Sequence, residues 1–155
     1  MNKFLKLIIS LVVVYTTAFF GSYFTFSSIS GWYAHLIKPS FSPPNWIFGP
    51  VWTVLYLMMA ISFYLIWEKN NLNKVCRPAK LFLMQLLLNF FWSLLFFGLH
   101  QPFLAFVDIF LLWIFILLTI LEFKKRSKTA GYLLIPYLIW VSFASILNLS
   151  IVLLN

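Results

Sequence analysis

The sequence predicts an all-α membrane protein, a single domain over residues 1–155 built as a bundle of five transmembrane helices. Hydrophobic residues make up 63% of the chain and charged residues only 9%, with a mean hydropathy of +0.98. Soluble domains carry roughly 25% charged residues because their surface lies in water. A helix needs about 20 apolar residues to cross the hydrocarbon layer, and five stretches qualify, at about 5–27, 46–67, 79–98, 104–123 and 131–153.

The first span begins like a secretory signal, because Lys3 and Lys6 precede its apolar run. That run continues from Leu7 to about Phe26, longer than the roughly 7–15 residues of a signal core, and no Ala-x-Ala site closes it. We therefore expect a retained helix, with a cleaved signal as the alternative. The runs are also too long and too uniformly apolar for barrel strands, so helices, which pair their backbone groups internally, are expected throughout.

The basic residues predict the orientation of the bundle. Lys38 alone falls on one side of a five-span arrangement, and the other ten of the eleven fall on the opposite side: Lys3, Lys6, Lys69, Lys74, Arg77, Lys80, Lys124, Lys125, Arg126 and Lys128. Basic loops stay cytoplasmic, so the N-terminus is expected inside and the C-terminus outside. The net charge of +8 then reflects topology and contact with anionic lipid headgroups rather than nucleic acid.

The connections between the spans are unequal. The first, Ser28 to Asn45, is the longest, and it contains three prolines together with apolar residues such as Trp32, Tyr33 and Phe41. A flexible linker would be polar, so we expect a partly folded lid over the outer mouth of the bundle. The third connection, around 99–103, is short enough for a tight outer hairpin.

Two prolines fall inside the predicted spans. Pro50 is expected in the first turn of the second span, where proline is tolerated. Pro136 lies within the fifth span and is expected to bend that helix.

The inventory of reactive groups is thin. The single cysteine, Cys76, excludes an internal disulfide, and the two histidines, His35 and His100, are not spaced with a cysteine or an acid as metal ligands are. No phosphate-binding glycine loop or Ser/His/Asp set is present. We therefore expect no metal site and no required cofactor. Both histidines map to outer connections, where one could reach a haem iron, with solvated or capping imidazoles as the alternative.

Only three acids are present. Glu68 and Glu122 end their spans beside basic loops, where pairing with those basic residues is a sufficient explanation. Asp108 lies about one turn inside the outer end of the fourth span, and an ionisable group within a membrane is a functional candidate by default. The alternative is a structural carboxylate that pairs with polar groups of the outer loops or with a helix N-terminus.

Polar and aromatic residues share one face on three of the predicted helices. These stripes are Trp52 and Tyr56 in the second span, Gln85, Asn89 and Trp92 in the third, and Tyr137, Trp140, Ala144 and Asn148 in the fifth. One interpretation is helix packing through interhelical hydrogen bonds. The other is a cavity for a flat hydrophobic ligand, with aromatic walls, a few polar groups and room beside the small Ala144.

Three stretches resemble the translocator protein (TspO/MBR) family, also called tryptophan-rich sensory proteins or peripheral-type benzodiazepine receptors. They are WYAHLIKPSFSPPNWIFGPVWTVLY (32–56), LNFFWSLLFFG (88–98) with the segment that follows it to Asp108, and PYLIWVSFASILN (136–148). They lie in four of the five spans and in the main loop, so the resemblance covers essentially the whole chain.

The resemblance implies a membrane receptor or sensor, often homodimeric, in a bacterial cytoplasmic membrane. It implies binding of porphyrins such as protoporphyrin IX, and of isoquinoline carboxamides, in a cavity beneath the first loop. The family's ligand-binding positions correspond to Tyr33, Pro43, Trp52, Tyr56, Asn89, Trp92, Trp140 and Ala144. Some bacterial members degrade protoporphyrin in light and oxygen through two tryptophans that correspond to Trp52 and Trp140. An enzyme of that kind and a transporter of tetrapyrroles are the alternative functions.

The chain also departs from the family pattern. The tail LNLSIVLLN lacks the Tyr followed by Arg or Lys of the sterol motif in animal members, so this motif gives no support for sterol binding. The third span lacks the small-xxx-small pair attributed to some dimeric members, and Ala18 with Ser22 in the first span is a weak substitute. At the outer mouth, Lys38 or His35 is expected to pair with the propionates of a porphyrin.

Overall fold

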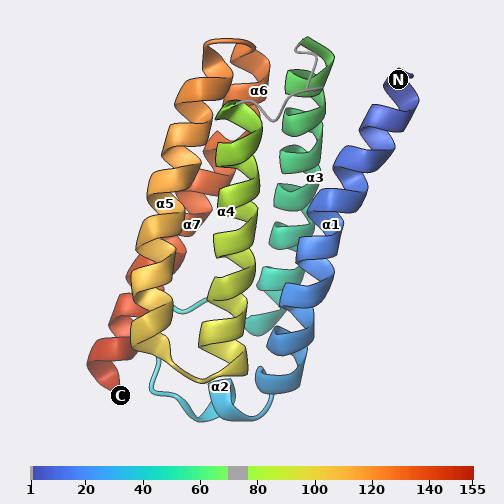
Figure 1. The fold of residues 1–155 in the computed structure, drawn as a ribbon. Coiled ribbons are helices and arrows are strands. Elements are labelled where there is room, and N and C mark those ends of the chain that lie inside the picture. Colours follow the sequence, from blue (N-terminus) through green and yellow to red (C-terminus); the bar gives the residue numbers. More distant parts are fainter. Residues whose placement is uncertain (1, 70–76) are drawn as a thin grey trace.

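The computed structural model describes residues 2–69 and 77–155 and confirms the all-helical class. Within these residues, five helices are long and apolar enough to cross a membrane: α1 (Lys3–Ser28), α3 (Asn45–Lys69), α4 (Arg77–Ser93) with the π-helical turn η1 (Leu94–Gly98), α5 (Pro102–Lys124), and α6 (Lys128–Leu133) continued by α7 (Ile135–Leu154). The two termini lie at opposite ends of the bundle (Figure 1). Lys74 and Cys76 lie outside the described residues.

The prolines correct two details of the predicted helices. Because α3 begins at Asn45, Pro50 lies in its second turn, so the expectation of a first-turn proline is wrong. The fifth span is interrupted at Leu134, between α6 and α7, with Pro136 in the first turn of α7. Proline has no N–H to donate, and its ring collides with the carbonyl four residues earlier, here that of Tyr132. The predicted bend at Pro136 therefore takes the form of a one-residue interruption between α6 and α7, which together form one span.

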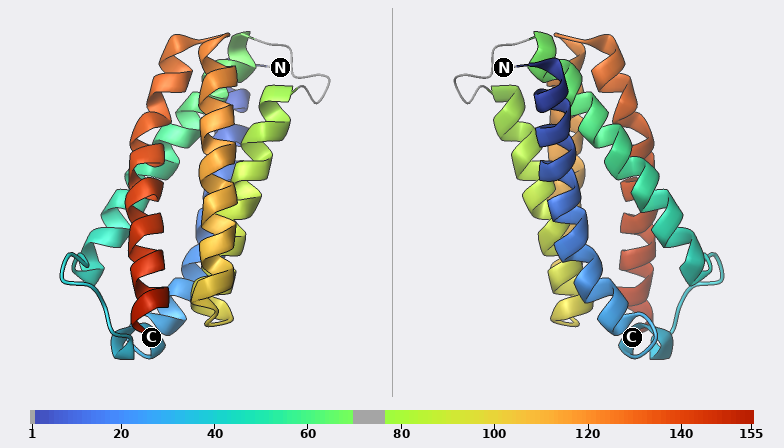
Figure 2. Two further views of the ribbon diagram at one scale, coloured as in Figure 1. Left: turned by 90° about the vertical axis from the view of Figure 1, so that its left-hand side faces the viewer. Right: turned by 90° about the vertical axis from the view of Figure 1, so that its right-hand side faces the viewer.

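The bundle is packed tightly at the end that carries the N-terminus. Phe82 of α4 stacks on Phe63 of α3 with ring centroids 4.5 Å apart and on Phe123 of α5 at 5.8 Å. Met59 and Ile66 of α3 are fully buried beside them. Toward the other end α3 runs obliquely, so that its Asn45 end lies apart from both α1 and α7 (Figure 2). The larger of two buried clusters among the described residues therefore fills this half, and a smaller one that includes Tyr33, Phe96 and Phe97 lies toward the other end.

Charged residues gather at the same end as the N-terminus. The Lys6 ammonium lies 2.9 Å from the Glu68 carboxylate, and Glu122 is paired with Lys125 at 3.1 Å and Arg126 at 3.6 Å. Pairing with basic residues is thus confirmed for Glu68 and Glu122. This clustering places the ends of α1, α3 and α5 at one membrane face, and the assignment of that face to the cytoplasm stays a prediction.

The first connection is folded, as predicted. It contains the short helix α2 (Trp32–His35), whose Trp32 ring stacks on the His100 ring at 4.4 Å, and it buries Tyr33. The side chain of Asn155, the last residue, accepts a hydrogen bond from the Ile37 N–H and donates one to the Ile37 carbonyl, both at 3.0 Å. The C-terminus therefore holds the connection against the end of the bundle, where Figure 1 shows α2.

The first connection packs against the hairpin between η1 and α5. His100 adopts a left-handed backbone with φ of 55° at the turn, which gives the tight hairpin that the sequence predicts. The Ser28 hydroxyl donates its hydrogen bond to the Phe97 carbonyl at 2.6 Å, so it accepts one from His100 Nε2 at 3.2 Å. His100 is therefore an exposed residue whose ring also anchors the hairpin to Ser28 and Trp32.

Two glycine-to-alanine substitutions test the difference between the packed half and the open half. A Cβ at Gly131 would collide with the Lys124 side chain and lie 3.2 Å from the carbonyl oxygen of Ile120. Gly131→Ala is therefore expected to lower the free energy of unfolding by about 1–3 kcal/mol. At Gly49 an added Cβ meets nothing within 4 Å, and Gly49→Ala is expected to be neutral or to stabilise by about 0.5–1 kcal/mol. Thermal unfolding in detergent measures the stability of both variants. Equal destabilisation by the two substitutions would contradict the assignment of Gly131 to the packed half and Gly49 to the open half.

Candidate functional site

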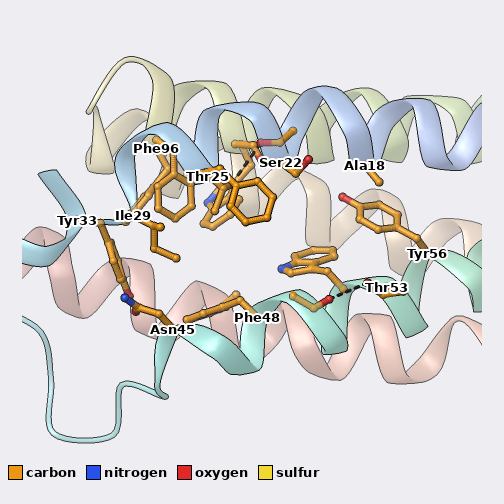
Figure 3. A pocket seen from close by; sticks show the side chains of 18 of the residues that line it. Ala18, Ser22, Thr25, Ile29, Tyr33, Asn45, Phe48, Thr53, Tyr56 and Phe96 are labelled. Atoms are coloured by element: carbon orange, nitrogen blue, oxygen red, sulfur yellow. Dashed lines mark hydrogen bonds between the residues drawn. The ribbon is translucent and has the colours of Figure 1, made fainter. Parts of the chain in front are cut away.

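A cavity of about 550 Å³ occupies the open half of the bundle, beneath the first connection. Its walls come from α1, α3, α4 with η1, and α7, and Tyr33 of α2 closes part of the end beneath the first connection. Figure 3 shows Ala18, Ser22 and Thr25 of α1 on one side and residues of α3 on the other. Its volume is in the range of pockets that enclose small organic ligands. The structure therefore contains a cavity of the kind that the second interpretation of the aromatic stripes requires.

Six of the eight predicted ligand-binding residues line this cavity: Tyr33, Trp52, Tyr56, Trp92, Trp140 and Ala144. Trp52 and Tyr56 stack at 5.3 Å with an interplanar angle of 29°, as their four-residue spacing predicts. Asn89 and Pro43 are not among the lining residues. Ligand contact by any of the eight stays a prediction, but the structure brings six of them to one space from four different elements.

Asn89 lies behind the cavity wall and fixes it. The Tyr56 hydroxyl donates to Asn89 Oδ1 at 2.6 Å, and Asn89 Nδ2 donates to the Tyr137 hydroxyl at 3.0 Å. All three residues are buried and come from α3, α4 and α7. Since an unpaired polar group is costly in the membrane interior, this chain of hydrogen bonds joins the three helices at the inner end of the cavity.

Trp92 is held in a similar way on the opposite wall. Its indole N–H donates to Asn148 Oδ1 at 3.0 Å, and Asn148 Nδ2 donates to the Pro102 carbonyl at 2.9 Å. The Trp92 ring also stacks on Phe96 at 5.3 Å. These contacts join α4, α7 and the start of α5, so the ring is fixed without any ligand.

Trp140 is positioned by aromatic contacts. Its ring lies 6.0 Å from Phe48 of α3 and 5.5 Å from Phe143 of α7. The indole N–H is buried and finds no hydrogen-bond partner among the described residues. A buried N–H does not face the open cavity, so Trp140 presents ring carbon surface to it. Ala144, one turn further along α7, leaves space beside this ring.

The contribution of α1 to the cavity was not predicted. Ala18, Ser22 and Thr25 line it together with Tyr15 and Gly21. Their spacing of three and four residues places them on one face of α1, and small or hydroxyl side chains among bulky neighbours are the signal that could have indicated this wall. Ala18 and Ser22, the weak packing motif expected in the first span, thus line the cavity, and the homodimer stays a prediction.

The ionisable residues named from the sequence are engaged elsewhere. Lys38 Nζ donates to the carbonyls of Tyr33 at 2.8 Å, Leu36 at 3.2 Å and Ala34 at 3.3 Å, so the ammonium holds the turn that follows α2. His35 Nδ1 lies 2.7 Å from the Gly31 carbonyl oxygen. None of the described residues that line the cavity is charged.

Tyr33 and Asp108 differ in their relation to the cavity. Burial raises the pKa of the Tyr33 phenol, an effect that a hydrogen bond with Ser42 partly offsets, so the hydroxyl stays neutral. Asp108 is buried in α5, away from the cavity lining, and its Oδ2 has no hydrogen-bond partner among the described residues. The pairing suggested for Asp108 is therefore not seen at this oxygen.

The fold and the cavity together define an integral membrane protein with five spanning helices and an aromatic, uncharged chamber in one half of its bundle. Comparison with known families agrees with this class, because the profile of the TspO/MBR family matches residues 9–154. The chain belongs to the TspO/MBR family, as its resemblance predicts.

Relatives from all three domains of life share most of their length with this chain. The tryptophan-rich protein TspO of Archaeoglobus fulgidus is 49% identical over 97% of each chain. The protein of that name from Chlorobaculum tepidum is 47% identical over 100% of this chain and 99% of its own. The human translocator protein is 39% identical over 84% of this chain and 78% of its own.

The hydrogen bonds of Asn89 give a test of the cavity's support. Asn89→Leu removes both bonds and leaves two buried tyrosine hydroxyls unpaired, so it is expected to lower stability by about 1–3 kcal/mol. Tyr56→Phe removes only one of the two bonds and is expected to cost less. Thermal unfolding in detergent compares the two variants. A loss for Asn89→Leu no larger than that for Tyr56→Phe would show that the bond to Tyr137 contributes nothing.

Proposed function

We propose that this protein is a membrane receptor or sensor that binds protoporphyrin IX and similar flat tetrapyrroles in the cavity. The observation that carries the proposal is that three indole rings, Trp52, Trp92 and Trp140, line one uncharged chamber of about 550 Å³. A flat macrocycle stacks on aromatic faces with an offset geometry. A mostly apolar wall with a few polar groups is typical of sites for such molecules.

The absence of charge among the described lining residues suggests how the ligand is oriented. A carboxylate buried without a partner is strongly disfavoured, so the propionates are expected at the loop end, nearest the membrane surface. Lys38 would have to break hydrogen bonds to three carbonyls before pairing with a propionate. We therefore expect the macrocycle to bind through its apolar body rather than through an ion pair with Lys38.

The proposal requires no metal and no cofactor, and the porphyrin is the ligand or the substrate. It places the protein in a bacterial cytoplasmic membrane with the first connection on the outer side. It includes a homodimer, as the family resemblance implies.

A second candidate function is the light-dependent breakdown of the bound porphyrin, with dioxygen as the oxidant. Trp52 and Trp140 line the same cavity, so both indoles would lie against one ligand. An indole beside a photoexcited porphyrin can donate an electron to it or react with singlet oxygen. The Trp140 N–H makes no hydrogen bond within the described chain, so replacing this residue by phenylalanine removes the indole without breaking such a bond.

Titration with protoporphyrin IX in the dark tests the binding proposal. Saturable binding, followed by the porphyrin's absorbance and by quenching of tryptophan fluorescence, is expected for the unmodified protein. Trp140→Ala and Trp52→Ala each remove a cavity wall and are expected to raise Kd at least about tenfold, equivalent to about 1.4 kcal/mol.

The control for this titration is Trp46→Ala. Trp46 is 74% exposed and does not line the cavity, so the same truncation there is expected to leave Kd unchanged. Folded Trp140→Ala and Trp52→Ala variants that bind as tightly as Trp46→Ala would show that the porphyrin does not occupy this cavity.

Illumination in air separates a receptor from an enzyme. An enzyme is expected to convert bound porphyrin to a new absorbing product faster than free porphyrin bleaches, and the double variant Trp52→Phe with Trp140→Phe is expected to lose this conversion. Both phenylalanines retain an aromatic wall, so saturable dark binding should persist. A double variant that binds porphyrin and still forms the product at the unmodified rate would exclude the indoles from the chemistry.

A further inference from the structure

Several residues that line the cavity are also strongly exposed on the outside of the bundle. Phe19 and Phe26 of α1 are 70% and 76% exposed, and both line the cavity. Asn45, Gly49 and Thr53 of α3 line it too and are likewise exposed. A residue that belongs to a cavity wall and to the outer surface at once marks the edge of an opening, so the cavity opens between α1 and α3.

The limits of this opening follow from the contacts between the two helices. The Tyr15 hydroxyl of α1 donates to the Thr53 carbonyl of α3 at 3.2 Å, and this bond closes the inner end. Beyond it α3 slants away from α1 toward the first connection (Figure 2). Gly49 lies at the middle of this edge, and a Cβ placed there would meet nothing within 4 Å. The gap therefore runs along the outer half of both helices.

The opening faces lipid rather than water. Both α1 and α3 are long and apolar enough to cross a membrane, and the edge lies within them. Phe19 and Phe26 at its border are the kind of side chain that lies in hydrocarbon without cost. Thr53 satisfies its own hydroxyl by donating to the Gly49 carbonyl at 2.9 Å. Outward of the Tyr15–Thr53 bond, the described residues form no hydrogen bond between α1 and α3 that an apolar molecule would have to break in order to pass.

The loop end of the cavity is closed by specific contacts instead. Asn155 holds Ile37 through two hydrogen bonds, the Trp32 ring stacks on His100, and Lys38 ties the turn after α2 to three carbonyls. A ligand that arrived from water would have to open these contacts first. The opening between α1 and α3 therefore presents the smaller barrier to the entry of a ligand.

We propose that the cavity exchanges its ligand directly with the lipid phase, through the opening between the outer halves of α1 and α3. The ligand class is then a flat molecule that partitions into the bilayer before it binds. The inference rests on the proposed function for the identity of the ligand, and it adds the route and the phase from which the ligand is taken.

The test measures the rate at which the reconstituted protein takes up protoporphyrin IX from vesicles that carry it, followed in the dark by the porphyrin's own fluorescence. Gly49→Trp places a large ring in the opening and is expected to slow association at least about tenfold. Val54→Trp is the matched control, because Val54 is exposed on the same helix but does not line the cavity. Its association rate is expected to stay within about twofold of the unmodified rate.

Two further variants separate the lateral route from the loop route. Phe26→Ala removes a border ring and is expected to speed association about threefold, whereas Asn155→Ala releases the first connection and should change it less than about twofold. Faster association in Asn155→Ala, together with an unmodified rate in Gly49→Trp, would establish the loop route and overturn the inference. If Gly49→Trp abolishes equilibrium binding, the rate of Phe26→Ala decides, and an unchanged rate there overturns the inference.

The equilibrium titration keeps this inference separate from the proposed function. Absence of saturable porphyrin binding by the unmodified protein would refute the proposed function. Saturable binding with association rates that do not respond to Gly49→Trp or to Phe26→Ala would leave the function standing and refute only the lateral route.

Discussion

The chain of hydrogen bonds from Tyr56 through Asn89 to Tyr137 is the interaction on which the rest of the site depends. Helices in lipid gain little from the hydrophobic effect when they associate, so van der Waals packing and interhelical hydrogen bonds decide where they touch. This chain joins α3, α4 and α7 where the packed half of the bundle ends. Beyond it α3 diverges from its neighbours, and the space so created is the cavity.

The two halves of the bundle also differ in the kinds of side chain that they contain. Stacked phenylalanines such as Phe63 and Phe82 fill the half near the N-terminus, and the ion pairs of Glu68 and Glu122 lie at that end. The hollow half is lined by indoles, phenols and small hydroxyl side chains, with no charge among the described lining residues. A site of this composition can hold a flat apolar body, while any charged substituent is left to the loop end.

Polar side chains of the hollow half serve mainly to hold rings in place. Asn148 fixes Trp92, and Asn89 fixes Tyr56, so these amides act as supports for the wall rather than as free ligand-binding groups. This explains why Asn89 shares a helix face with cavity residues although it does not line the cavity. Helical periodicity shows which residues lie on one face, but it cannot distinguish a wall from the residue that stands behind it.

The sequence by itself determined the membrane class, the five spans, the folded first connection and the aromatic stripes, because apolar length and helical periodicity are local properties of the chain. Only the tertiary structure decided that the stripes enclose a space, that α1 supplies one of its walls, that Lys38 and His100 are engaged in holding the lid, and that Pro136 follows a break between two helices. These features depend on the angle at which α3 crosses the bundle and on contacts between residues far apart in the chain. Neither is encoded in the pattern of any single helix.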